Sequence, residues 1–325
     1  MIICENLTRY FGSFAAVDHV SIHIPRGAIC ALVGPNGAGK TTTMRMLSTL
    51  LLPSRGRASV GGRDIVKAPR AVRQLLGYLP ETFNLYDDMT VERYLQFFAR
   101  AYGMAGEEAS TRIIDFLERL DLREKRNARI STLSRGMRQR LGVAKSFLHD
   151  PEVVFLDEPA SGLDPVARVE LRDFLKYQQY MGKTVVISSH VLKELADFCD
   201  HVAIIQRGRL VEFGPISGAG GVLAKYQQTA QTGLRYTLRA LRDTPRLEEF
   251  LKTLDTVSNI TRRDVTVTFE LSGDEEIAAQ LLSRLTAAGF VISRFSPEEI
   301  DLEHVYRRAS AEPKNAPAPE GSVLK

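Results

Sequence analysis

The stretch Gly34-Pro35-Asn36-Gly37-Ala38-Gly39-Lys40-Thr41 decides the fold of this chain. It follows the apolar run 28–33 and precedes a run typical of a helix, predicted to extend from Lys40 to Leu52. Because glycine has no side chain, backbone N–H groups in such a loop can approach phosphate oxygens, and the following helix points its positive end at the anion. Lysine supplies a point charge for the β- and γ-phosphates, and the Thr41 hydroxyl can bind Mg²⁺. The stretch therefore predicts a strand, a phosphate-binding loop and a helix that together bind a nucleoside triphosphate.

A second stretch, Val153–Glu158, is an apolar run typical of a buried strand and ends in two carboxylates. Such a strand places Asp157 at its carboxyl end, beside the phosphate loop, where it can hold Mg²⁺ through water. Glu158 follows directly and can orient or deprotonate the water that attacks the γ-phosphate. Alone, these residues could equally be an exposed acidic strand end, but next to a phosphate loop they indicate a nucleoside triphosphatase. The two motifs do not say which kind.

The composition is that of an ordinary globular protein, with 44% hydrophobic and 25% charged residues in a chain of 325. This excludes collagen-like, disulfide-rich and wholly disordered chains. A net charge of +4 is too small to indicate a nucleic-acid partner, and we expect none. No run approaches about 18 apolar residues and the N-terminus lacks a signal-peptide pattern, so we expect neither a membrane span nor a leader. Cys4, Cys30 and Cys199 are widely spaced and are expected to be buried free thiols.

Strand-like and helix-like runs alternate along the first two thirds of the chain. The clearest helical runs lie at 91–103 and 111–122. The strand-like runs lie at 2–7, 20–24, 28–34, 153–159, 184–190 and 201–208. This alternation predicts an α/β domain with a mostly parallel sheet.

The composition changes at residues 214–221, GPISGAGG, which marks the region of a domain boundary. Beyond it the runs follow the order βαββαβ, typical of a small α+β, ferredoxin-like domain. Its strands are expected at 234–241, 256–261, 264–271 and 290–295, and its helices at 247–254 and 274–289. We therefore predict one domain at 1–225 and a second at 226–310. The Pro- and Ala-rich tail, 311–325, is predicted to be disordered.

The segment Leu133–Arg140, LSRGMRQR, resembles the signature sequence of ATP-binding cassette (ABC) ATPases, LSGGQ followed by Gln-Arg. Other motifs of that family stand in order over residues 1 to about 215. They are an adenine-stacking aromatic at Phe11 or its neighbour Tyr10, a Q-loop at Pro80-Glu81, a D-loop at Ser161–Asp164 and a switch histidine at His190. Kinases and GTPases with a phosphate loop share only the first two motifs described above. The sequence is therefore identified as a member of the ABC ATPases.

This resemblance implies an α/β P-loop NTPase fold, with an ABC ATPase core and a helical subdomain at about 82–140. It implies that Glu158 and His190 are catalytic, with the histidine near both the γ-phosphate and the glutamate. It implies Mg²⁺ ligands at Thr41, Glu81 and Asp157. ATP would be bound by Phe11, Gly34, Pro35, Asn36, Gly37, Ala38, Gly39, Lys40, Thr41 and Thr42 of one chain, and by Ser134 and Gly136 of a second. A homodimer would then enclose two ATP molecules.

The chain departs from the family pattern at two places. Arg135 stands at the third position of LSGGQ, where the family has Gly, and Met137 stands at the fifth, where the family has Gln. Backbone contacts to phosphate survive this change, but a side-chain hydrogen bond from the fifth position does not. Glu81 stands at the Q-loop, where a carboxylate can still meet Mg²⁺ but cannot donate a hydrogen bond.

The regions around the Q-loop and signature, with the downstream α+β domain, resemble exporter-type subunits of the drug-resistance, sodium-efflux and gliding-associated branch. This implies an ATPase, peripheral on the cytoplasmic face of the cell membrane, that powers export through a separately encoded integral membrane permease. Two alternatives stay open: a soluble ABC ATPase of translation or DNA repair, and an inactive regulatory cassette. The single cassette without zinc motifs or coiled-coil insertion disfavours the first, and intact Lys40, Asp157, Glu158 and His190 disfavour the second.

Overall fold

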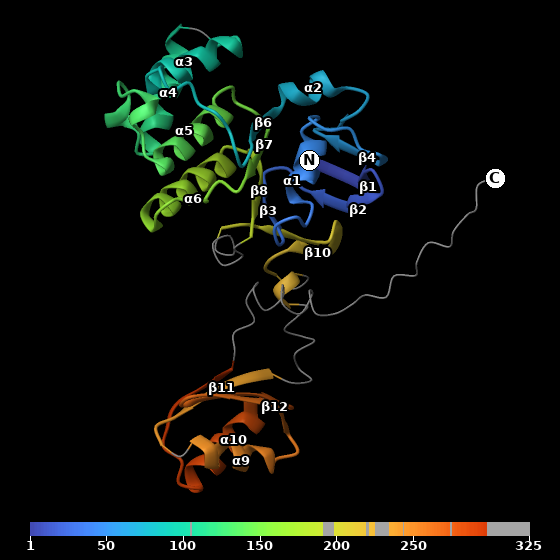
Figure 1. The fold of residues 1–325 in the computed structure, drawn as a ribbon, viewed down its shortest axis with the longest axis vertical. Coiled ribbons are helices and arrows are strands. Elements are labelled where there is room, and N and C mark those ends of the chain that lie inside the picture. The colour runs from blue at the N-terminus through green and yellow to red at the C-terminus, as the bar shows by residue number, and fades with distance from the viewer. Residues whose placement is uncertain are drawn as a thin grey trace, which may run out of the picture. The chain divides into compact units, whose positions relative to one another are not determined.

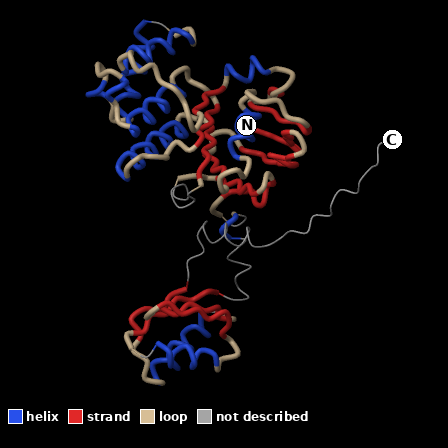
Figure 2. The backbone as a smooth tube through the Cα atoms, in the orientation of Figure 1, coloured by secondary structure: helices blue, strands red, loops and turns tan. Residues whose placement is uncertain are grey.

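The computed structural model describes residues 1–104, 106–190, 198–218, 221–224, 234–242, 244–273 and 275–297. These residues form two compact units, one ending at Ile216 and one beginning at Ser217. Figure 1 labels the helices and most of the strands, and Figure 2 colours the backbone by secondary structure. The predicted boundary at 225/226 and the predicted disordered tail 311–325 lie outside the described residues.

The first unit is built on a six-stranded sheet with the strand order β10-β9-β3-β8-β7-β6. All neighbouring strands are parallel except β10, which is antiparallel to β9, so the prediction of a mostly parallel sheet is confirmed. Every residue of the central strands β3, β7 and β8 is buried, as expected for a sheet covered on both faces. The strands are β3 (Ile29–Val33), β6 (Leu76–Leu79), β7 (Val153–Asp157), β8 (Thr184–Ser189), β9 (His201–Gln206) and β10 (Arg209–Pro215).

A separate antiparallel sheet, with the order β2-β1-β4-β5, completes the strands of this unit. Its strands are β1 (Ile2–Phe11), β2 (Phe14–Ile24), β4 (Arg55–Val60) and β5 (Arg63–Asp64). The strands predicted at 2–7 and 20–24 exist, but they do not belong to the parallel sheet. Helix α1 (Lys40–Leu47) contacts β2 and β4 of this sheet and β7 of the other. Its buried Met44 joins residues of both sheets in one core cluster.

Helix α1 is shorter than predicted, because it ends at Leu47 instead of Leu52. Ser48 caps it by donating its backbone N–H to the Met44 carbonyl. Thr49 then takes a positive φ of 62°, which the regular helix does not allow. The leucines that suggested a longer helix lie in the following loop, where Leu50 and Leu52 are exposed.

The helices of the first unit lie on both faces of the parallel sheet. Figure 1 shows α3, α4, α5 and α6 together on one side, with α1 and α2 on the other. Helix α5 contacts β6 and β7, and α6 contacts β8, so these two helices cover the sheet directly. The helices are α2 (Pro69–Gln74), α3 (Val91–Ala101), α4 (Gly106–Arg119), α5 (Arg135–Phe147) and α6 (Pro165–Tyr180), with 3₁₀ turns at Arg123–Lys125 and Ile130–Thr132.

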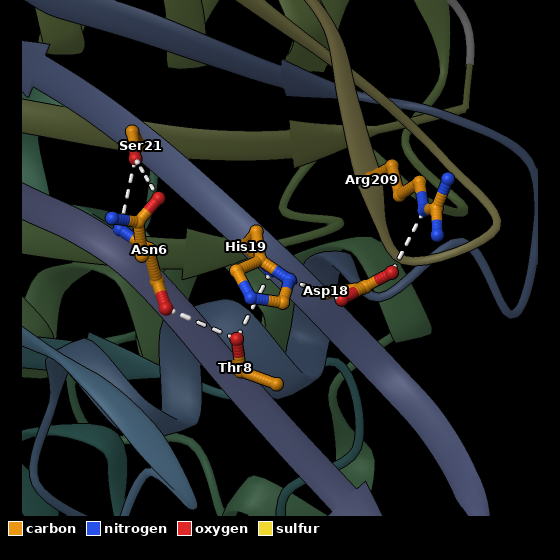
Figure 3. A network of polar contacts seen from close by, with 6 residues as sticks. All are labelled: Asn6, Thr8, Asp18, His19, Ser21 and Arg209. Atoms are coloured by element: carbon orange, nitrogen blue, oxygen red, sulfur yellow. Dashed lines mark hydrogen bonds and ion pairs between the residues drawn. The ribbon is translucent and has the colours of Figure 1, made fainter. Parts of the chain in front are cut away.

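A network of polar contacts joins β1 and β2 to the hairpin between β9 and β10, as Figure 3 shows. The His19 backbone N–H donates to Thr8 Oγ1 at 3.1 Å, and the His19 ring lies 2.5 Å from Asp18. Asp18 in turn accepts from Arg209 Nε at 2.7 Å. His19 matches no motif, and its contacts here are with residues of β1 and β2 that hold the fold together.

In its described part, the second unit contains a four-stranded antiparallel sheet with the order β12-β13-β11-β14 and the helices α9 and α10. Its elements are β11 (Leu234–Ala240), α9 (Thr244–Lys252), β12 (Val257–Arg263), β13 (Thr266–Leu271), α10 (Glu275–Ala287) and β14 (Ile292–Pro297). This order along the chain is the predicted βαββαβ. One sheet face carries Tyr236, Leu238, Phe269 and Leu271, which pack with leucines of both helices in a core of their own.

The cysteines are buried free thiols, as predicted. Burial raises the pKa of Cys4 to about 12 and the pKa of Cys199 well above its ordinary value. Among the described residues, no helix is both long and apolar enough to cross a lipid bilayer.

Candidate functional site

The predicted phosphate loop leaves the carboxyl end of β3 and curls around the side chain of Lys40. Lys40 is only 6% exposed, and its Nζ donates to the carbonyl oxygens of Gly34 at 2.7 Å and Pro35 at 3.4 Å. Gly37 and Gly39 have positive φ angles of 79° and 106°, which glycine adopts without strain. A Cβ on Gly39 would also lie 2.6 Å from the Ala16 carbonyl oxygen. The loop geometry therefore depends on glycine and on the buried ammonium.

Asp157 ends strand β7 and is completely buried. Its Oδ1 accepts a hydrogen bond from Ser188 Oγ at 2.5 Å, while its Oδ2 is buried without a hydrogen-bond partner among the described residues. A buried carboxylate oxygen without a partner costs free energy unless a cation or water meets it. Carboxylate oxygen is also a ligand that Mg²⁺ prefers. Asp157 beside the phosphate loop therefore fits a magnesium-bound nucleotide.

Glu158 lies between a lysine and a histidine. Its Oε1 is 3.5 Å from Lys40 Nζ, and its Oε2 is 2.9 Å from His190 Nδ1. The Glu158 backbone has a positive φ of 50°, and its N–H donates to Ser188 Oγ at 2.8 Å. Non-glycine residues rarely adopt this conformation, and it often marks functional sites. Glu158 is 9% exposed, whereas the His190 side chain is 53% exposed, so the pair reaches from the buried strand end to the surface.

A cavity of about 440 Å³ brings most of the predicted site residues together. Twelve of them line it: Phe11, Pro35, Asn36, Gly37, Ala38, Gly39, Lys40, Thr41, Thr42, Glu81, Glu158 and His190. Gly34 and Asp157 are not in the lining; Gly34 directly follows β3, and Asp157 is the last residue of β7. Of the two aromatic candidates, Phe11 lines the cavity and Tyr10 does not. The cavity therefore combines an aromatic ring, a phosphate loop and carboxylates within one chain.

Three residues of this region were not predicted from the sequence. Phe14 and Ala16 line the cavity beside Ser161 of the predicted D-loop, and Ser188 bridges Asp157 and the Glu158 backbone. Phe14 faces Phe11 across the β1–β2 turn, and its ring is 65% exposed. The spacing of two aromatic residues around Gly12-Ser13 is a signal that could have revealed Phe14. No local pattern singles out Ser188, because it meets Asp157 only through the pairing of β7 with β8.

Ser134 and Gly136 lie outside this cavity, on the first turn of α5. Ser134 is exposed and caps the helix, since its hydroxyl accepts from the Met137 N–H at 3.2 Å. Gly136 is half-buried and faces Leu163. The two signature residues are therefore not brought to the phosphate loop of their own chain.

The departures from the family pattern have defined contacts. Arg135 Nη2 donates to Ser161 Oγ at 3.4 Å, and its side chain lies against Gly162, where a Cβ would come within 2.7 Å of Arg135 Nε. Arg135 thus joins the signature segment to the predicted D-loop, whose Ser161 lines the cavity described above. Glu81 is exposed and lines the same cavity as the phosphate loop.

The remaining histidines match no motif, and those among the described residues do not line the cavity. Burial lowers the pKa of His149, whose Nε2 lies 2.8 Å from the Leu76 carbonyl and whose ring stacks on Tyr102. His23 and His201 lie on β2 and β9. His304 lies outside the described residues.

Comparison with known proteins shows which family this chain belongs to. Residues 17–161 match the family model described as ABC transporter. The ABC transporter ATP-binding protein NatA of Bacillus subtilis (strain 168) is 40% identical over 203 residues, which are 62% of this chain and 82% of NatA. The uncharacterized ABC transporter ATP-binding protein YxlF of the same strain is 35% identical over 308 residues, which are 94% of this chain and 98% of YxlF.

A third relative is longer than this chain. The probable multidrug ABC transporter ATP-binding protein YbhF of Escherichia coli (strain K12) is 40% identical over 214 residues, which are 66% of this chain. The match spans 37% of YbhF.

Solved structures share the fold of the first unit. An ATP-binding subunit of an ABC transporter has a TM-score of 0.62 at 30% identity, over 66% of this chain and 90% of the other. The ATP-binding cassette MJ0796, a dimer in a post-hydrolysis state with ADP and Pi, has a TM-score of 0.61 at 24% identity, over 67% of this chain and all of the other. With the phosphate loop, the paired carboxylates and the signature segment in place, this chain belongs to the family of ABC transporter ATP-binding proteins.

Proposed function

We propose that the chain binds ATP with Mg²⁺ and hydrolyses it to power export through a separate integral membrane permease. The observation that carries this proposal is Glu158, held on the wall of the nucleotide cavity between Lys40 and His190 at 3.5 and 2.9 Å. A carboxylate in this position can accept a proton from water, and the phosphate loop beside it can hold the γ-phosphate that the water attacks.

ATP would lie along the cavity with its adenine on Phe11 and its phosphates on residues 34–42. The loop N–H groups and the Lys40 ammonium neutralise the phosphates. Thr41 and Asp157, with Glu81 at the cavity edge, are the oxygen donors proposed to hold Mg²⁺. When bound, Mg²⁺ would neutralise charge on the β- and γ-phosphate oxygens. Ser188 donates to one Asp157 oxygen and so leaves the other free to face the metal.

The hydrolytic step would depend on Glu158 and His190. Glu158 orients the attacking water and draws its proton toward Oε1 or Oε2. His190 holds Oε2 from the other side, and its exposed ring is free to contact the γ-phosphate. The Glu158 carboxylate and the phosphates of ATP would repel each other, and the positive charge of Lys40 reduces this repulsion.

Two chains would enclose two ATP molecules. Ser134 and Gly136 lie on the surface at the start of a 13-residue helix, outside the cavity of their own chain. Their N–H groups are thus available to the γ-phosphate held by a second copy. This arrangement makes the homodimer the hydrolytically competent form.

The transport role rests on the names of the relatives, among which are a probable multidrug transporter subunit and Nod factor export proteins. We propose that this chain likewise works at the cytoplasmic face of the cell membrane and exports its substrate.

The experiment that tests the transport role is affinity purification of the tagged Glu158→Gln chain from detergent-solubilised membranes. An integral membrane protein encoded by the adjacent gene should co-purify in a fixed ratio, and its addition should raise the ATPase rate of the unmodified chain. Recovery of the chain without any membrane protein would contradict the transport role.

Phe11→Ala is expected to weaken ATP binding by about 5- to 150-fold in Kd, because stacking of a base on an aromatic ring contributes about 1–3 kcal/mol. The measurement is isothermal titration with ATP. The matched control is Phe97→Ala, since Phe97 is similarly exposed but lies on α3, outside the cavity lining. If Phe14→Ala lost affinity for ATP and Phe11→Ala did not, adenine would stack on Phe14 and not on Phe11.

We further propose that residues 226–310 form a regulatory or dimer-supporting domain. They carry no nucleotide motif, and the core of the second unit shares no residue with the core that surrounds α1. A chain ended at residue 225 should keep its far-ultraviolet circular dichroism and bind ATP with unchanged affinity, while its assembly or its ATPase regulation changes. A folded truncated chain that no longer binds ATP would contradict this division of roles.

A further inference from the structure

The sheet of the second unit has one face that neither α9 nor α10, its helices among the described residues, covers. Helices α9 and α10 both pack on the face that carries the buried core, through Leu247, Leu251, Leu281 and Leu285. Figure 1 shows both helices on the same side of this sheet. The opposite face, here called the open face, consists of the alternate residues of each strand.

The strand register arranges the open face in rows that run across the sheet. In one row Arg239 stands directly opposite Arg294 on one side and Thr266 on the other, and Thr266 stands opposite Arg263. Three arginines and a threonine thus cross all four strands. The next row carries only hydroxyl side chains, Ser296, Thr237, Thr268 and Thr261.

The arginine row concentrates positive charge without neutralising it. Like charges directly opposite on neighbouring strands are destabilising, so the pairing of Arg239 with Arg294 has a cost in the isolated unit. All three arginines are exposed, and none is in an ion pair in the part of the chain that the structure describes. Asp264 follows Arg263 in the turn between β12 and β13, and Glu270, on the same face beyond the hydroxyl row, accepts from Asn259 Nδ2 at 2.7 Å.

On the covered side of the same sheet, an arginine is ion-paired. Arg262, the neighbour of Arg263 on β12, donates to Glu248 of α9 at 2.8 Å. The domain therefore pairs an arginine on its helical side and leaves three adjacent arginines on its open face. Adjacent arginines of this kind are typical of a surface that binds an anionic partner.

We propose that the open face binds the phosphate headgroups of an anionic lipid bilayer. Guanidinium groups bind phosphate through two parallel hydrogen bonds, and the neighbouring hydroxyl row can hydrogen-bond headgroup oxygens. Strands are about 4.8 Å apart, so Arg239 and Arg294 can share one phosphate while Arg263, two strands away, meets the next. The inference rests on the proposed function for the presence of a membrane next to the chain.

Two other occupants fit the open face less well. Proteins that bind single-stranded RNA on a sheet stack its bases on aromatic side chains, and neither row contains one. Small ligands prefer concave, largely apolar sites, whereas these rows lie on the open surface of a single sheet. A bilayer surface requires neither aromatic rings nor a cavity.

The test is co-sedimentation of the full chain with phosphatidylglycerol vesicles and with phosphatidylcholine vesicles. Binding should require phosphatidylglycerol and should weaken as salt is raised. Each arginine near an anionic surface contributes about fivefold in affinity, so Arg239→Gln/Arg294→Gln should bind about 25-fold more weakly. The matched control, Arg262→Gln/Arg284→Gln, removes the same charge from the helical side and should bind much like the unmodified chain.

Three results would overturn the inference: equal binding to both vesicle types, unchanged binding of the Arg239/Arg294 variant, or equal weakening of both double variants. Tight binding of inorganic phosphate, with no binding to vesicles, would assign the face to a soluble phosphate ligand instead. Phosphate release from ATP is measured on the same samples. Arg239→Gln/Arg294→Gln should hydrolyse ATP normally, and Lys40→Ala should still bind vesicles, so failure of vesicle binding and failure of the ATPase are distinguishable.

Discussion

Lys40→Ala is expected to abolish ATP hydrolysis and to weaken ATP binding. The Lys40 ammonium is buried and bonded to the Gly34 and Pro35 carbonyls, so alanine removes both the positive charge and the group around which the loop curls. Removing one preorganised charge or donor from a reacting site typically lowers the rate by about 10²–10³-fold, and here the loop geometry is lost as well. The measurement is phosphate release from saturating Mg-ATP, together with a nucleotide titration.

The matched control for Lys40 is Lys183→Ala. Lys183 is also largely covered, and its ammonium pairs with Asp150 at 2.9 Å, but it lies outside the nucleotide cavity. This variant should keep the ATPase rate of the unmodified chain. An unchanged turnover for Lys40→Ala, with the unmodified chain active, would show that the phosphate loop is not the hydrolytic site.

Features that depend on short stretches of chain were predicted from the sequence. The phosphate loop is local, because its conformation follows from Gly37, Gly39 and the lysine that begins the helix. The carboxylates Asp157 and Glu158 lie where an apolar strand ends, and the order of strands and helices follows the hydrophobic periodicity. The βαββαβ order of the second unit was accessible for the same reason.

Features that depend on pairing between distant segments were not predicted. Ser188 reaches Asp157 only because β7 and β8 are neighbours in the register that places Asp157 beside Ser188. The antiparallel sheet of β1, β2, β4 and β5 separates from the parallel sheet because α1 fills the space between them. The early end of α1 reflects the backbone of Thr49, whereas its leucine-rich continuation looks helical by propensity.

The Arg135 contact explains how the chain accommodates its unusual signature. With glycine at this position the segment would have no side chain to reach Ser161. Arginine instead spans to the D-loop hydroxyl and lies over Gly162, whose missing side chain makes room for it. Ser161 N–H in turn donates to the Glu158 carbonyl at 3.1 Å. A continuous set of contacts therefore runs from the signature helix to the proposed base.

Glu158→Gln is expected to slow ATP hydrolysis by about 10²–10⁴-fold while ATP binding is retained. Glutamine has nearly the same size and can still accept a hydrogen bond from His190, but it cannot take a proton from water. The proposed phosphate contacts of residues 34–42 and the position of Asp157 Oδ2 should be unchanged. Without hydrolysis, the dimer closed over ATP should accumulate. Light scattering coupled to size exclusion should then show twice the monomer mass in Mg-ATP, and the monomer mass without nucleotide.

The matched control is Glu152→Gln, which removes a carboxylate just before the amino end of β7 while Glu158 lies just after its carboxyl end. Glu152 pairs with Arg26 at 2.9 Å and lies outside the nucleotide cavity, so this variant should hydrolyse ATP like the unmodified chain. The two readouts of Glu158→Gln separate the two parts of the proposal. Normal hydrolysis would exclude Glu158 as the base, because glutamine at this position cannot take a proton from water. Slow hydrolysis by a protein that stays monomeric in saturating Mg-ATP would keep Glu158 as the base. It would contradict a dimer held together by ATP alone. Pairing of the two chains would then require the membrane partner.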